Sequence, residues 1–345
     1  NPGGIYTVAL PGITTQAATT LAPVDKLAIS TVVDAANGFA YVGMDTSPAK
    51  IARVRLSDFT QTGSLTLNAS ESQPYVGVVD PPRNCVYFGT NTNPGQIVKI
   101  DLTTFSVTAR LTLPAGESYL RSVVIDTQGG YAYFGTDTNT GKVVKINLAT
   151  FTRVDAVTLN SGEGGLGSAV IDPAHGFAYF GTYSDPGIVV KINLNTFTRE
   201  GALPLNSGEG YLRTAGIDAA QETAYFGTYT SPSRLIKVDL NPFTRAEAVT
   251  LGAVLDPALA MSLDTQQGVA FIGLYSYPGQ IAQVDLANMT QLAALTLPAG
   301  YQYPISGGID PANSNVYFST WSNPAKVVKL HYTVPTHVYL PAILR

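Results

Sequence analysis

Hydrophobic and polar residues recur along this chain in blocks of equal length. The block AYFGT at residues 132–136 has close copies before and after it, with one small residue at the same point in each copy. These small residues are Gly43, Gly89, Gly135, Gly181, Gly227, Gly273 and Ser319. Each step is 46 residues, and a period of this size without an insertion indicates a repeat architecture.

Each period contains four short apolar segments separated by turn-forming residues. In the segment 142–148, Val144 and Ile146 alternate with Lys145 and Asn147, which is the two-residue period of a β-strand. No segment keeps an apolar period of 3.6 residues, so we expect almost no helix. In the third period the predicted strands, named A to D in chain order, cover residues 121–125, 131–136, 142–148 and 153–159.

Seven such periods predict an all-β fold, a seven-bladed β-propeller formed by residues 1–345 as a single domain. Closing the blades into a ring removes most free sheet edges. A phenylalanine repeats before strand D, as at Phe151, and is expected to pack between blades. An aspartate ends strand A in every copy, where it is expected to accept backbone N–H bonds within the A–B turn. These residues are Asp34, Asp80, Asp126, Asp172, Asp218, Asp264 and Asp310.

The two ends of the chain do not match a simple ring. Residues 1–10 align with residues 93–102, so the chain starts in the middle of a blade, at strand C, and residues 1–24 form a C–D strand pair for ring closure or donation. At the other end, 326–345 holds a further strand C and an apolar tail in the phase of strand D. Seven A–B pairs and about eight C–D pairs leave one surplus hairpin.

Two outcomes are open for the surplus strands. They can broaden one blade of the same molecule, or they can pair with another subunit by β-augmentation and so build a filament or lattice. In the second case the protein is its own partner, and deleting 1–24 or 326–345 should leave a folded, monomeric ring. The apolar terminal residues expected to mediate assembly are Ile5, Tyr6, Val8, Val338, Tyr339, Leu340, Ile343 and Leu344.

Composition narrows the class of protein. Charged residues make up 13% of the chain and the formal net charge is −4, so the sequence has no basic field for nucleic acid or an anionic membrane surface. It has no run of about 20 apolar residues that would span a membrane. The start at Asn1 and the low charge favour a secreted protein after signal-peptide removal, extracellular or at the cell surface. Asn68 and Asn288 begin N-glycosylation sequons.

Two sets of loop residues are candidates for ligand binding. In a propeller the D–A and B–C loops share one face, so repeated D–A carboxylates would form a partial ring around one mouth of the channel. Aromatic side chains in the B–C loops would face these carboxylates. The two sets together could hold a cation, a sugar or a basic peptide. Alternatively, the glutamates only accept backbone hydrogen bonds. The candidates are Asp25, Glu71, Glu117, Glu163, Glu209, Tyr183, Tyr229, Tyr275 and Trp321.

No catalytic motif is present. His175, His331 and His337 lie apart from any repeated carboxylate at ligand spacing, and the sequence has no HExxH, CxxC, GxSxG or Walker loop. We therefore expect no catalytic residues, no metal and no cofactor.

AYFGT, a Pro-Gly loop and a VVKIDL-like strand together resemble the YVTN-type repeats of seven-bladed propellers in surface-layer and secreted proteins. The resemblance covers essentially the whole chain, although Phe-Gly-Thr replaces Val-Thr-Asn here. It implies a place outside the cytoplasm and a structural or adhesive role, which we expect to be self-assembly. The alternatives are an extracellular propeller that binds a glycan or other cell-surface component, and a lyase-like propeller enzyme.

Overall fold

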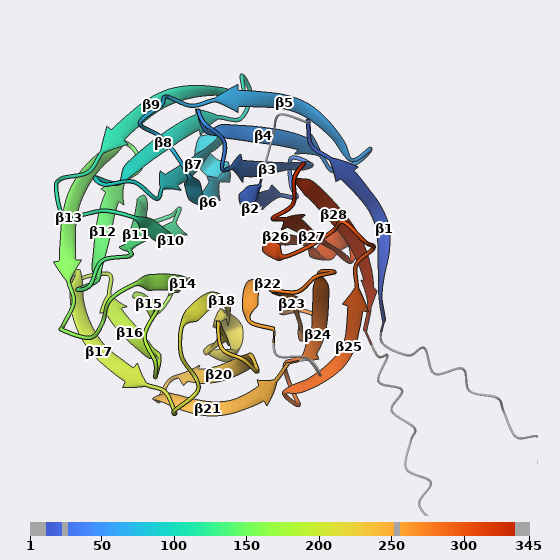
Figure 1. Ribbon diagram of the computed structural model, residues 1–345. Helices are drawn as coiled ribbons and strands as arrows, with labels where there is room; N and C mark the ends of the chain where they lie inside the picture. Colours follow the sequence, from blue (N-terminus) through green and yellow to red (C-terminus); the bar gives the residue numbers. More distant parts are fainter. Residues whose placement is uncertain (1–11, 23–26, 252–255, 335–345) are drawn as a thin grey trace, which may run out of the picture.

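The computed structural model describes residues 12–22, 27–251 and 256–334. In this part of the chain 28 strands form seven antiparallel four-stranded sheets, which surround a central channel like the blades of a propeller (Figure 1). The predicted fold, an all-β seven-bladed propeller, is confirmed.

Each blade runs from strand A at the channel to strand D at the rim. The A strands are β2 (Ala28–Asp34), β6 (Pro74–Asp80), β10 (Leu120–Asp126), β14 (Leu166–Asp172), β18 (Leu212–Asp218), β22 (Ala258–Asp264) and β26 (Pro304–Asp310). The B strands are β3 (Phe39–Met44), β7 (Cys85–Thr90), β11 (Tyr131–Thr136), β15 (Phe177–Thr182), β19 (Thr223–Thr228), β23 (Val269–Leu274) and β27 (Asn315–Thr320). The C strands are β4 (Lys50–Arg55), β8 (Gln96–Asp101), β12 (Lys142–Asn147), β16 (Ile188–Asn193), β20 (Arg234–Leu240), β24 (Gln280–Asp285) and β28 (Lys326–Thr333). The D strands are β5 (Thr60–Thr66), β9 (Ser106–Thr112), β13 (Thr152–Thr158), β17 (Thr198–Pro204), β21 (Phe243–Thr250), β25 (Thr290–Thr296) and β1 (Gly12–Thr20).

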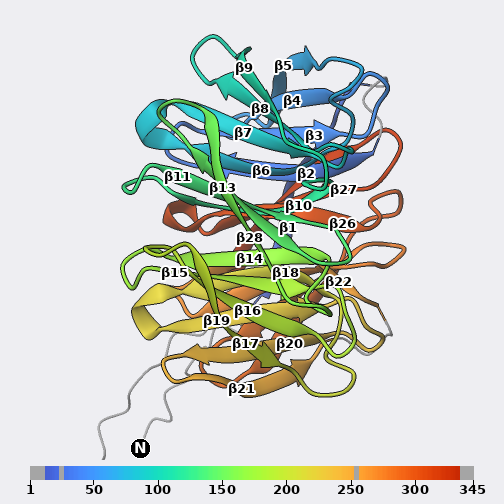
Figure 2. The ribbon, with the colours of Figure 1, turned by 90° about the vertical axis from the view of Figure 1, so that its left-hand side faces the viewer.

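We number the blades 1 to 7 in the order of their A strands. The A–B and C–D turns lie on one face of the ring, and the B–C and D–A loops lie on the other (Figure 2). Three A–B turns contain a single turn of 3-10 helix: η1 (Pro81–Arg83), η2 (Ala219–Gln221) and η3 (Pro311–Asn313). These nine residues are the only helix in the described part of the chain.

The repeated aspartates close the A–B turns as expected. Asp126 accepts the backbone N–H of Gly129 at 2.7 Å, and corresponding bonds form at Asp34, Asp172, Asp218 and Asp264. The prediction is confirmed in these five turns. In the other two, the aspartate is followed by proline and accepts a side-chain donor instead, from Arg83 to Asp80 and from Asn313 to Asp310.

Aromatic contacts hold neighbouring blades together. Phe151 of blade 3 stacks on Tyr87 of blade 2 with 5.7 Å between ring centres, and the same pairing recurs around the ring. Between blades 1 and 7 the pair is Phe59 and Tyr317, at 6.1 Å. The predicted packing of this phenylalanine between blades is confirmed.

The repeated glycine of strand B marks a close approach between blades. A Cβ atom added at Gly135 would collide with the Ser122 hydroxyl and would lie 2.8 Å from the Cβ of Leu166 in the next blade. Backbone pairing sets Ser122 directly opposite Gly135. A side chain at Gly135 therefore has no space unless the next blade moves outward.

We expect Gly135→Ala to lower the free energy of unfolding by about 1–3 kcal/mol, the usual cost of overpacking a core. The matched control is Gly201→Ala on outer strand β17, where an added Cβ meets nothing within 4 Å. Chemical denaturation of both variants checks this. Equal stability of the two would contradict the close packing at Gly135.

The seventh blade is completed by strands from both ends of the chain. β26, β27 and β28 supply strands A, B and C, and β1 pairs antiparallel with β28 as strand D. Of the two N-terminal strands expected in this blade, only strand D is present in it, because β28 already occupies the position of strand C. Deleting 1–24 would remove β1, and deleting 326–345 would remove β28. We therefore now expect either deletion to destabilise the ring, in place of the folded, monomeric ring expected from the sequence.

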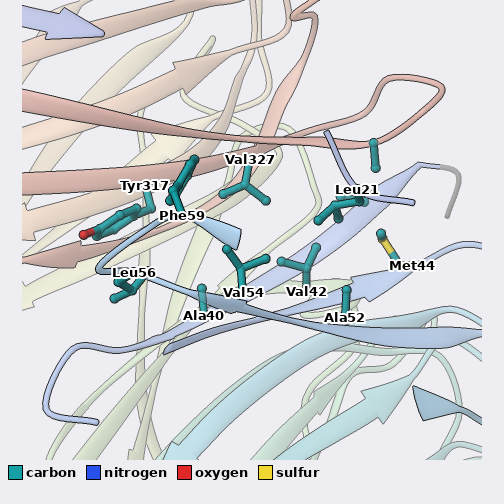
Figure 3. Close-up of a cluster of buried hydrophobic side chains, with 12 residues drawn as sticks. Leu21, Ala40, Val42, Met44, Ala52, Val54, Leu56, Phe59, Tyr317 and Val327 are labelled. Carbon is teal, nitrogen blue, oxygen red and sulfur yellow. The ribbon is translucent and has the colours of Figure 1, made fainter. Parts of the chain in front are cut away.

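Hydrophobic side chains from blades 1 and 7 meet where the ring closes (Figure 3). Val42, Val54 and Phe59 of blade 1 face Tyr317 and Val327 of blade 7 in this cluster. Leu21, just after β1, joins the same cluster and is 1% exposed. The segments predicted to mediate assembly, at 5–10 and 336–344, lie outside the described residues.

Candidate ligand-binding site

A cavity of about 450 Å³ opens at the mouth of the channel, on the face of the B–C and D–A loops. We call it the mouth cavity. Two sets of residues with 46-residue spacing supply nearly all of its wall. The first set follows strand B in each blade: Asp45, Asn91, Asp137, Tyr183, Tyr229, Tyr275 and Trp321. The second set is the second residue of each A strand: Ile29, Tyr75, Arg121, Gly167, Arg213, Leu259 and Ile305.

Backbone hydrogen bonds place the first set. In each blade the residue after strand B donates its N–H to a carbonyl in the D–A loop, as Tyr229 does to Tyr211 at 2.9 Å and Trp321 to Tyr303 at 3.0 Å. This bond holds the start of the B–C loop against the inner end of the D–A loop. The side chain at this position consequently points over the mouth in every blade, whatever its type.

A β-bulge places the second set. In every blade the register between strands A and B shifts across this residue, as between Leu120 and Ser122 for Arg121, and between Leu212 and Thr214 for Arg213. A bulge leaves its extra residue unpaired and re-aims the side chain. These seven residues also line the narrower channel beneath, so they form the floor of the mouth cavity.

Blades 4 to 7 supply a continuous series of aromatic rings, which we call the aromatic arc. Tyr183, Tyr229, Tyr275 and Trp321 line the mouth cavity, and Tyr211 and Tyr303 contact these rings without belonging to the lining. Neighbouring ring centres along it are 4.4–6.1 Å apart, and Tyr275 and Tyr303 are stacked. Burial raises the pKa of the Tyr183 and Tyr229 phenols, so both stay neutral near pH 7. The members of the arc are, in order, Tyr211, Tyr183, Tyr229, Tyr275, Tyr303 and Trp321.

The opposite wall, from blades 1 to 3, is polar. Asn91 donates to the side-chain oxygen of Gln73 at 2.7 Å, and Gln73 donates to Asp45 at 3.3 Å. Asn91 Oδ1 in blade 2 and Trp321 Nε1 in blade 7 are buried atoms with no hydrogen-bond partner in the described protein. Buried polar atoms are nearly always satisfied, so we expect an ordered water molecule beside each of them.

The polar part of the floor consists of two arginines and a tyrosine. Arg213 of blade 5 reaches across the channel and donates a hydrogen bond to the hydroxyl of Tyr75 in blade 2. The guanidinium carbons of Arg121 and Arg213 lie 4.2 Å and 4.9 Å from the centre of the Tyr75 ring. Arg121 has a counter-charge, because its Nε lies 3.1 Å from Asp137. Arg213 forms no ion pair with any described carboxylate.

The glutamates predicted to ring the mouth lie elsewhere. Glu71, Glu117, Glu163 and Glu209 are at most 5% exposed, and each forms an ion pair with an arginine on an outermost strand. The backbone explains this position: the carbonyl of Glu163 accepts the N–H of Gly141 in the preceding blade, while its carboxylate accepts Arg199 at 2.5 Å. These pairs tie blades together away from the channel. Asp25 lies outside the described residues.

The prediction that these four glutamates ring the mouth is therefore wrong. The alternative prediction, that they accept backbone N–H bonds, agrees better with the structure. Glu163 accepts the N–H of Asn160 at 3.0 Å, and Glu209 accepts that of Asn206 at 3.1 Å. The four predicted aromatic residues, in contrast, all line the mouth cavity.

The floor residues Tyr75, Arg121 and Arg213 were missed from the sequence. Their signal was one position of strand A that varies between Ile, Tyr, Arg, Gly and Leu, whereas the next position is Ser, Thr or Ala in all copies except at Val76. Variation at a repeated position next to a channel is the feature that could have singled them out.

Three further features considered from the sequence are the glycosylation sequons, a metal site and a membrane span. Asn68 and Asn288 are both exposed in turns, where a glycan would have space. Within the described ranges no three His, Cys, Asp or Glu side chains are grouped to hold a metal ion. The same residues include no helix with the length and apolar character needed to cross a bilayer.

The class defined by this architecture is a seven-bladed β-propeller with a ligand-sized cavity at one mouth of its channel. The sequence matches no model of a known protein family and no curated protein. Among solved structures it is similar to a chain of hydrazine synthase from Kuenenia stuttgartiensis, with a TM-score of 0.76 and 12% identity over 91% of this chain and 97% of that chain. At this identity the likeness concerns the fold alone, and the resemblance to YVTN-type repeats stays a prediction.

Proposed function

We propose that this protein is a non-enzymatic binding propeller that holds a carbohydrate in the mouth cavity. The observation that carries the proposal is the aromatic arc facing a polar wall across a cavity of about 450 Å³. A sugar ring has an apolar C–H face, which packs on aromatic rings, and hydroxyl groups at its edge, which need hydrogen-bond partners. Asp45 and Asp137 line the same cavity, and their carboxylates can accept further hydrogen bonds beside those from Gln73 and Arg121. Cavities of a few hundred Å³ with few polar groups are typical ligand sites.

The charge of the lining argues against the other ligands considered from sequence. The acidic ring that would have attracted a cation or basic peptide is absent from the described mouth, and Arg121 pairs with Asp137. Asp45 is engaged by Gln73. At the floor lies Arg213, a cation with no ion-pair partner among the described residues.

We expect Tyr229→Ala to weaken carbohydrate binding about tenfold, which corresponds to roughly 1.4 kcal/mol. The Tyr229 ring lies in the middle of the arc, 6.1 Å from both neighbours, so its removal takes away a stacking surface without breaking a hydrogen bond. A glycan array would find the ligand, and calorimetry would measure its affinity. The control is Tyr277→Ala, because Tyr277 is 70% exposed and outside the cavity lining. Absence of glycan binding, or equal loss in both variants, would contradict the proposal.

A place outside the cytoplasm belongs to the same proposal and is supported by the low charge content and the YVTN-type resemblance. Self-assembly through the chain ends is a second proposal, which the two surplus terminal segments support. It concerns residues 1–11 and 335–345, and its test is given with the deletions in the Discussion.

A further inference from the structure

We infer that the carbohydrate is acidic and that Arg213 binds its carboxylate at the floor of the mouth cavity. This inference rests on the proposed carbohydrate binding and names the class of sugar: an oligosaccharide that contains uronic acid.

The first reason is the unused hydrogen-bonding capacity of Arg213. A guanidinium carries five N–H donors, and in the described protein Arg213 uses its Nη2 toward the Tyr75 hydroxyl. Its planar group is held by the Tyr75 ring 4.9 Å away, so its orientation is set before a ligand arrives. A planar carboxylate matches this geometry with two parallel hydrogen bonds, which are among the strongest in proteins.

The second reason is charge. Two guanidinium groups contact one phenol ring, yet among the described residues only Arg121 has a carboxylate partner, Asp137 at 3.1 Å. Partly buried charges are normally paired, because moving a charge out of water costs free energy. The described part of the floor therefore lacks one negative charge, and an anionic ligand group would supply it.

The third reason is position. Arg213 belongs to the floor, whereas Tyr183 and Tyr229 belong to the wall above it. All three side chains line the same cavity, so a ligand that packs on the two rings also meets the Arg213 guanidinium. A pyranose stacked on these rings would direct a carboxyl group on its edge toward the guanidinium.

The test compares matched ligands on the full chain. Oligomers of galacturonate, of mannuronate and of a glucuronate-containing polymer are titrated by calorimetry, each beside its carboxyl-reduced neutral counterpart and beside a sulfated oligosaccharide. We expect at least one uronate oligomer to bind about 30-fold more tightly than its neutral counterpart. Arg213→Gln should remove that difference, so that the acid and its neutral counterpart bind this variant equally.

Two controls separate this effect from others. Arg55→Gln makes the same charge change at an exposed site outside the cavity and should keep the preference for the acid. Arg213→Gln loses the hydrogen bond to the Tyr75 hydroxyl and the cation–π contact with the Tyr75 ring, and thermal melting checks that the variant is folded. If neutral and acidic oligomers bind equally, the inference fails but carbohydrate binding stands. If the sulfated sugar binds best, the carboxylate assignment is overturned. If no oligomer binds, the inference fails, and the glycan array decides separately whether carbohydrate binding stands.

Discussion

Deleting residues 1–22 will open the ring and lower the free energy of unfolding by about 5–10 kcal/mol, which is comparable to the whole stability of a typical domain. β1 contributes eight residue pairs to β28, from Gly12 opposite Thr333 to Thr20 opposite Lys326. Each backbone hydrogen bond adds about 0.5–1.5 kcal/mol net. Leu21 is buried between blades 1 and 7 (Figure 3), and losing such a side chain costs about 2–5 kcal/mol.

Guanidinium chloride unfolding followed by circular dichroism measures this loss. Two control deletions, of residues 1–11 and of 335–345, leave β1 and β28 whole and should unfold at nearly the wild-type midpoint. Light scattering of the same samples tests self-assembly through the chain ends. Wild type should be larger than a monomer, and at least one of the deletions 1–11 and 335–345 should give a monomer. A peptide of residues 12–22 added to the open ring should restore part of the stability. A 1–22 deletion as stable as wild type would contradict the closure by β1.

The second large effect on stability is expected from the ion pairs between glutamates of the D–A loops and arginines of the outermost strands. We expect Arg199→Leu to lower the free energy of unfolding by about 3 kcal/mol at pH 7, the lower end of the range for breaking a buried pair, because Arg199 keeps 26% exposure. The variant leaves the Glu163 carboxylate 5% exposed without its partner. The exposed pair of Arg55 and Asp58 is the control, and Arg55→Leu should cost less than about 1 kcal/mol.

The pH dependence of this difference follows from Glu163. Burial by itself would raise its pKa, but the hydrogen bonds from Arg199 and from the Asn160 N–H, with the Arg199 charge, hold it below the ordinary value. A lowered pKa stabilises the folded state above the unfolded pKa of about 4.3, and this contribution is lost as pH falls through the folded pKa. Without Arg199, burial dominates and raises the pKa of Glu163. The charged carboxylate then destabilises the folded state at neutral pH. The stability gap between wild type and Arg199→Leu should therefore be widest near pH 7 and narrow below about pH 4.3. A gap that does not change with pH would contradict a charged Glu163.

Local features of the chain were read correctly from sequence. The alternation of Val144, Lys145 and Ile146 and the regular turns predicted four strands per repeat, because a strand's side-chain period of two depends only on its own backbone and two faces. The strand bounds in the third period agree with the structure to about one residue. The turn aspartates, such as Asp126, were also predictable, since their partner lies three residues away.

The candidate site was predictable only in part. The aromatic residues at 183, 229, 275 and 321 were placed at the mouth correctly, because they follow strand B directly and a loop residue there has few alternatives. The glutamates were placed wrongly. Nothing in the spacing of Glu163 shows that an arginine 36 residues later turns back from an outermost strand to meet it.

The sequence alone specified the repeat, its four strands and the number of blades, since these depend on interactions within a few residues of one another. Tertiary structure decided the rest. Which strands complete blade 7 depends on β1 and β28, whose paired residues lie more than 300 positions apart. The floor of the mouth cavity depends on a bulge in each A strand and on Arg213 meeting Tyr75, 138 residues away, across the channel. Such contacts form only once the blades have closed into a ring, so no local pattern in the chain records them.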